Sequence, residues 1–140
     1  MQSTEKHLAV TRTARYYQAG ELSPKTRRLW IVLHGYGQKA SFFIKHFEHL
    51  VDGGDCVIAP EGLSRFYLDG KWERVGATWM TKEDRLHEIQ DYVAYLDAVL
   101  ANANGGQALP EVVLLGFSQG ATTAWRWLMK GKIRPQQFIM

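Results

Sequence analysis

The stretch Glu111–Trp125, EVVLLGFSQGATTAW, decides the fold of this 140-residue chain. It contains the pattern G-x-S-x-G with Ser118 at its centre. An apolar run precedes the pattern and a helix-forming run follows it, which predicts a buried strand, a sharp turn and a helix. Such a turn exposes a serine hydroxyl above the edge of a sheet, and its glycines let neighbouring backbone approach closely. Ser118 is therefore a candidate nucleophile. The other interpretation is a glycine-bounded turn whose serine only caps the helix.

A second turn supports the first. His34-Gly35-Tyr36-Gly37 directly follows the apolar run LWIVL at 29–33. A turn at the carboxyl end of an early strand can aim a backbone N–H at the site above Ser118. We therefore expect the N–H groups of Tyr36 and Gln119 to form an oxyanion hole. His34 itself is expected to be structural and to pack under the turn.

The rest of the chain alternates strands with helices. We expect strands over 8–18, 29–33, 55–60, 112–115 and 137–140, and helices over 41–51, 81–103 and 120–129. Ser41 is the expected cap of the first helix, with Phe42, Phe43, Phe47 and Leu50 on its buried side. Residues 61–80 read as a long loop with a short hairpin. Buried strands that alternate with helices predict one α/β domain over 1–140, with a mainly parallel sheet flanked by helices.

Composition excludes several other classes of protein. The chain is 46% hydrophobic and 22% charged, with a net charge of +3, so it carries no strongly basic nucleic-acid surface. Its single cysteine, Cys56, forms no disulfide within the chain, and no cluster with metal-ligand spacing occurs. No apolar run reaches the roughly 18 residues of a membrane span. No secretion signal is visible, so a cytoplasmic location is the default expectation.

Three motifs carry a resemblance to a known family. LHGYGQ at 33–38, APEG at 59–62 and LGFSQGA at 115–121 occur in this order. Together they resemble the phospholipase/carboxylesterase family of α/β hydrolases, the relatives of acyl-protein thioesterases. The resemblance implies an α/β-hydrolase fold with Ser118 as nucleophile and Tyr36 and Gln119 at the oxyanion hole. It also implies a small-molecule ester or thioester substrate and no cofactor.

The segment between APEG and the long helix departs from the thioesterase pattern. It carries four aromatic residues: Phe66, Tyr67, Trp72 and Trp79. They are candidates for an apolar substrate wall. The alternative is that they cover the edge of the sheet.

The catalytic triad is incomplete in this sequence. In α/β hydrolases the order along the chain is Ser, then Asp or Glu, then His. The residues after Ser118 contain none of these three, and all five histidines precede it. We therefore expect the Asp and His to lie beyond residue 140, and the chain to be a partial α/β-hydrolase domain that lacks the C-terminal part of the fold. By itself it is expected to be weakly active or inactive.

Two functions follow from these features. One is a serine carboxylic-ester hydrolase of the esterase, lysophospholipase or thioesterase type, which forms an acyl-enzyme on Ser118. The other is a catalytically dead hydrolase-fold protein that binds a small acyl ligand or a protein partner.

Overall fold

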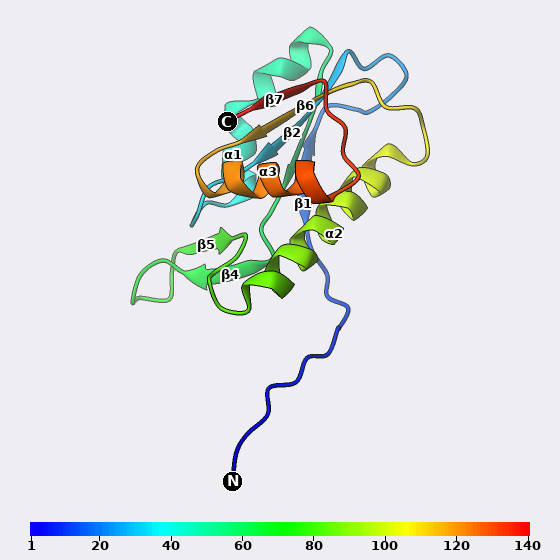
Figure 1. The fold of residues 1–140 in the computed structure, drawn as a ribbon. Coiled ribbons are helices and arrows are strands. Elements are labelled where there is room, and N and C mark those ends of the chain that lie inside the picture. Colours follow the sequence, from blue (N-terminus) through cyan, green and yellow to red (C-terminus); the bar gives the residue numbers. More distant parts are fainter.

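A five-stranded sheet forms the centre of the molecule in the computed structural model, which describes residues 1–140 (Figure 1). The order across the sheet is β1-β3-β2-β6-β7. Only β1 runs antiparallel to its neighbour; the other pairings are parallel. The strands are β1 Tyr16–Ala19, β2 Arg28–Leu33, β3 Cys56–Pro60, β6 Glu111–Gly116 and β7 Gln137–Ile139. The mainly parallel sheet expected from the sequence is confirmed.

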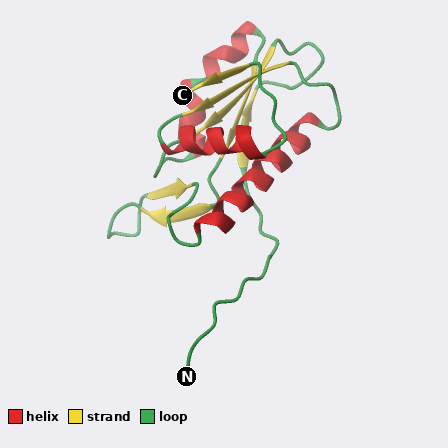
Figure 2. Cartoon of the chain, viewed as in Figure 1, coloured by secondary structure: helices red, strands yellow, loops and turns green.

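Helices cover both faces of this sheet (Figure 2). Two long helices, α2 (Arg85–Asn104) and α3 (Gln119–Lys130), pack on one face. The other face is covered by α1 (Ala40–Phe43) and two 3₁₀ helices, η1 (Ile44–His46) and η2 (Glu48–Gly53). Two-sided cover explains why the central strands read as continuous apolar runs: β3 is buried along its whole length.

The N-terminal half departs from the expected elements in two places. The strand expected over 8–18 is reduced to β1, and residues 1–15 have no regular structure. The helix expected over 41–51 is broken into α1, η1 and η2, and Ser41 does not cap it. Phe42, expected on the buried side, is 58% exposed. The other three residues do face the sheet: Phe43 is buried, and Phe47 and Leu50 are partly buried against the same apolar cluster.

The long helix α2 was predicted well at its centre and less well at its start. It begins at Arg85 after Asp84, four residues later than expected, and ends before Gly105. Ile89, Val93 and Leu96 are buried as the spacing indicates, whereas Leu86 in the first turn is exposed. The hairpin expected within 61–80 is present as β4 (Ser64–Tyr67) and β5 (Val75–Thr78), a separate two-stranded sheet. No helix of the chain has the length and hydrophobicity needed to cross a bilayer.

Candidate active site

Ser118 stands at the turn between β6 and α3 in strained backbone geometry. Its φ is 56° and its ψ is −118°, a conformation that a residue with a Cβ rarely adopts. The residue is exposed at the carboxyl end of β6, where the N-terminus of α3 begins. This is the geometry expected of a nucleophile turn, in which the strain keeps the hydroxyl clear of the helix behind it.

The two flanking glycines are required by close backbone approach. A Cβ at Gly120 would lie 2.1 Å from the carbonyl oxygen of Leu33, and a Cβ at Gly116 would lie 2.4 Å from the carbonyl oxygen of Gly120. Both distances are far inside van der Waals contact. The turn therefore sits directly against the end of β2, which the register Leu33↔Gly116 places beside it.

The predicted oxyanion turn lies next to the nucleophile turn. The Phe117 N–H donates to the Leu33 carbonyl at 3.1 Å, and a Cβ at Gly35 would meet Phe117 at 3.2 Å. Within residues 35–38, the N–H of Gly35 binds the Gln38 side chain, and those of Gly37 and Gln38 bind backbone carbonyls. The Tyr36 N–H has no acceptor in the protein, so this donor remains available for an oxyanion.

The β4–β5 hairpin pairs with the backbone of residues 37 and 38 in the predicted oxyanion turn. Gly37 N–H donates to Ala77 O at 2.8 Å, and Ala77 N–H donates to Gln38 O at 2.9 Å. The approach is so close that a Cβ at Gly76 would lie 2.3 Å from the Gly37 carbonyl oxygen. Sequence reasoning did not anticipate this docking, since backbone pairing between a turn and a distant hairpin leaves no periodic signal.

His34 is structural, as expected. Its side chain is fully buried, its Nε2 accepts the Gly62 N–H at 2.9 Å, and its Nδ1 lies 2.8 Å from the Gly35 carbonyl oxygen. Burial lowers the pKa of this imidazole, although the Gly35 carbonyl and the charge of Glu61 oppose the shift. A neutral His34 with Nδ1–H donating satisfies both contacts and fixes the chain entering the oxyanion turn.

The side chain of Gln119 makes hydrogen bonds that were not expected from the sequence. Its Oε1 accepts the Trp79 N–H at 3.0 Å, while its Nε2 donates to Met80 O and Thr78 Oγ1 at 2.9 Å each. The side chain thus fastens the residue after the nucleophile to the end of β5, 40 residues earlier in sequence. The G-x-S-x-G pattern leaves this position open, so the pattern alone indicates nothing about the role of the side chain.

Glu61 is a buried carboxylate that sequence reasoning missed. It accepts hydrogen bonds from Arg15 at 2.7 Å, Arg65 at 2.8 Å and the Ala40 N–H at 3.2 Å. Burial by itself would raise its pKa, but the two arginines outweigh this effect and the pKa lies below its usual value. Glu61 therefore connects three segments: the N-terminal tail (residues 1–15), the β4–β5 hairpin and the start of α1. The signal available was an acidic residue directly after a wholly apolar strand.

The four aromatic residues predicted to form one wall do not lie together. Phe66 packs on Tyr36 with ring centroids 5.2 Å apart. Tyr67 points to the other face of β4, since side chains alternate along a strand, and pairs with Trp72. Trp79 is 1% exposed, stacks on His34 and donates from Nε1 to its carbonyl at 2.8 Å. The expectation that Trp79 forms part of a substrate wall is therefore wrong. Its side chain lies in the core, where it packs against His34.

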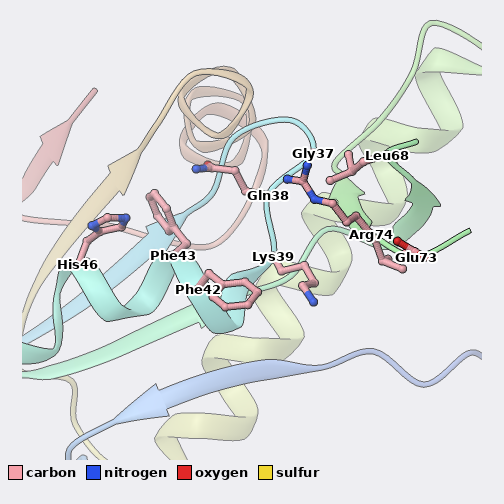
Figure 3. A pocket seen from close by; sticks show the side chains of 10 residues that line it. Gly37, Gln38, Lys39, Phe42, Phe43, His46, Leu68, Glu73 and Arg74 are labelled. Atoms are coloured by element: carbon pink, nitrogen blue, oxygen red, sulfur yellow. The ribbon is translucent and has the colours of Figure 1, made fainter. Parts of the chain in front are cut away.

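A cavity of about 460 Å³ lies beside the oxyanion turn (Figure 3). The turn contributes Gly37 and Gln38, the hairpin contributes Leu68 and Arg74, and α1 contributes Phe43 among others. None of the four predicted aromatic residues lines it. The Phe43 ring is 6.3 Å from the ring of Phe117, the neighbour of Ser118, so the cavity borders the nucleophile turn.

No histidine of the chain is placed as a base for Ser118. His34 is engaged with Gly35 and Gly62, and His7 and His87 contact Asp84. His46 packs against Phe43 and Phe47, and His49 is exposed on η2. The Ser118 hydroxyl makes no hydrogen bond with any side chain. The structure thus brings the turn of Ser118 and the turn of Tyr36 together, with no histidine hydrogen-bonded to Ser118.

Comparison with known proteins shows the fold. No family model and no curated protein matches the sequence. Solved structures do match: esterase PE8 has a TM-score of 0.66 at 22% identity over 91% of this chain. A phospholipase/carboxylesterase from Dyadobacter fermentans has a TM-score of 0.66 at 18% identity over 93% of the chain, and a lipase in its open form has 0.63 at 14% over 90%. The chain spans 62%, 60% and 39% of these three proteins. Its mainly parallel, helix-flanked sheet shares the fold of the α/β hydrolases.

Proposed function

We propose that the chain carries the nucleophile and oxyanion part of a serine hydrolase that acts on carboxylic esters or thioesters. The observation that carries the proposal is Ser118 in strained geometry beside the unpartnered N–H of Tyr36. The fold it shares with esterases and lipases supports the same reaction class.

In the proposed reaction, the Ser118 Oγ attacks the acyl carbonyl carbon while its proton passes to a general base. The Tyr36 and Gln119 N–H groups hold the resulting oxyanion, and Gln119 does so at the positive end of α3. Collapse expels the alcohol or thiol, which takes up the proton, and leaves an acyl-Ser118 ester. Water then hydrolyses this ester by the same route. None of the five histidines of the chain is placed to act as this base.

The substrate's position is proposed from the cavity beside the oxyanion turn. Its wall joins apolar surface from Phe43 and Leu68 to the charged Lys39 and Arg74. Of the predicted aromatic residues, Phe66 is proposed to act from the rim, because its ring packs on Tyr36. A small ester with an apolar acyl group fits this arrangement.

The missing base offers a direct test by chemical rescue. Added imidazole substitutes for an absent histidine, so the chain incubated with p-nitrophenyl butyrate and imidazole should accumulate a butyryl group on Ser118, detected by mass spectrometry of the peptide. Ser118→Ala is the matched control, and exposed Ser3 in the tail reports non-specific acylation. Acylation of Ser118 no faster than that of Ser3 contradicts the proposal.

The absence of a base at Ser118 also favours a second candidate, a catalytically inert hydrolase fold that binds an acyl compound or a protein. In that case imidazole leaves Ser118 unmodified, yet butyrate or a butyryl amide still binds the cavity and shifts the NMR signals of Phe43 and Leu68.

A further inference from the structure

Two histidines that are distant in sequence meet beside the start of α2. His7 belongs to the tail of residues 1–15, and His87 lies in the first turn of the helix. Their ring centroids are 4.3 Å apart. Figure 1 shows the tail running past this end of α2 as it leaves the body of the molecule. Nothing in the proposed hydrolase reaction uses either residue.

Asp84 lies between the two imidazoles. Its Oδ1 is 2.7 Å from His87 Nδ1, and its Oδ2 is 3.4 Å from His7 Nε2. An aspartate before a helix usually accepts hydrogen bonds from the first helical N–H groups. Asp84 makes no such side-chain bond, and its backbone is left-handed with φ of 50°. Its carboxylate is thus directed away from the helix end and toward the histidines.

We propose that His7, Asp84 and His87 form a binding site for a divalent metal ion of the zinc type, which fastens the tail to α2. The three donor atoms lie within 4.8 Å of one another. In tetrahedral zinc sites, bonds of 2.0–2.2 Å place donor atoms roughly 3.4 Å apart. The His7–Asp84 separation has this value already. All three side chains are exposed. The Asp84–His87 pair is closer, at 2.7 Å, because it is hydrogen-bonded, and a bound ion would replace this hydrogen bond.

The donor set selects the class of ion. Imidazole nitrogen with carboxylate oxygen suits zinc, nickel and copper, whereas magnesium and calcium prefer oxygen donors alone. A second carboxylate lies beside the site, because Glu5 Oε2 is 2.8 Å from His7 Nε2. The two carboxylates bring negative charge to the positive end of the helix.

Zinc titration of the chelator-stripped protein by calorimetry tests the site. The wild-type chain should bind one equivalent, and His7→Ala and His87→Ala should each weaken the affinity at least about tenfold, the lower end of what even outer-shell substitutions cause. His49→Ala removes an exposed histidine elsewhere and should change nothing. All three positions are exposed, so the variants keep the fold, which circular dichroism checks.

A second readout follows the tail directly. Zinc should slow tryptic cleavage after Lys6 and Arg12 in the wild-type chain, and it should not do so in His87→Ala. A wild-type chain that binds no zinc overturns the proposal, and so does His7→Ala binding as tightly as wild type, which would assign the ion to α2 alone. Neither assay involves Ser118, so the outcome of each is independent of the proposed hydrolase function.

Discussion

The amide of Gln119 holds the backbone of Trp79, with Oε1 accepting its N–H at 3.0 Å. This contact joins the residue that follows Ser118 to the segment that supports the turn of residues 34–37. Trp79 in turn donates from Nε1 to the His34 carbonyl at 2.8 Å. One polar side chain and one indole therefore link the two turns in addition to the hydrogen bond from the Phe117 N–H to the Leu33 carbonyl.

Replacing Gln119 should loosen this connection. Gln119→Ala removes three hydrogen bonds and leaves the Trp79 N–H without a partner, which should cost about 2–3 kcal/mol of unfolding free energy. Urea unfolding measures this loss. Gln107→Ala is the control, because that side chain is exposed and makes no hydrogen bond; an equal effect of both substitutions would show that the clamp is unimportant.

Glycine at position 118 should relieve the strain of the turn. At φ of 56° and ψ of −118°, backbone strain costs a residue with a Cβ about 1–3 kcal/mol. This cost is larger than the stability that glycine loses through the greater conformational entropy of its unfolded chain. Ser118→Gly should therefore be about 1 kcal/mol more stable than Ser118→Ala, and both should lose acylation. Thermal unfolding compares the two variants, and a more stable alanine variant would mean that the turn is relaxed.

Gly120 should tolerate no larger side chain. The added Cβ of Gly120→Ala would lie 2.1 Å from a backbone carbonyl that cannot move without displacing β2, so the loss should be about 3 kcal/mol or the protein should fail to fold. Gly70 is the matched control, since a Cβ there meets nothing within 4 Å. The fraction of soluble protein and the urea midpoint report the outcome. Similar behaviour of Gly120→Ala and Gly70→Ala would contradict the close approach.

His34 should make the fold sensitive to mild acid. Burial lowers its pKa in the folded state below the 6.5 of an exposed histidine, so the unfolded chain takes up a proton more readily. Its contribution to stability is complete above pH 6.5 and declines as the pH falls from 6.5 toward the folded pKa. Glu61 acts in a lower window: its stabilisation is present above pH 4.5 and is lost as the pH falls through its lowered pKa.

Proton NMR separates His34 from the other histidines. Its ring signals should titrate below the pH of 6.5 that is usual for a histidine. Urea midpoints of the wild-type chain should fall between pH 7.5 and pH 5. A His34 signal that titrates at pH 6.5 or above would show that the imidazole is accessible to solvent.

The sequence by itself determined the order of the elements and the candidate nucleophile. The apolar runs of β2, β3 and β6 identify buried parallel strands because a strand covered on both faces carries no polar alternation. The turn at Ser118 could be predicted because its two glycines permit close backbone approach and stand within a short, recognisable stretch of sequence. His34 was assigned a structural role because it directly follows a buried strand and was expected to pack under the turn.

Only the tertiary structure decided what supports these turns. The hydrogen bonds of the Gln119 amide, the contacts of Glu61 with Ala40 and Arg15, and the docking of Gly76 on Gly37 join residues that are 21 to 46 positions apart. No local pattern encodes such pairings. For the same reason, no sequence pattern could predict that Phe66 and Trp79 lie apart, or that His7 and His87 meet. Backbone periodicity specifies which way a side chain points from its own element, whereas its partners depend on how the elements pack, which is fixed by the burial of the whole core.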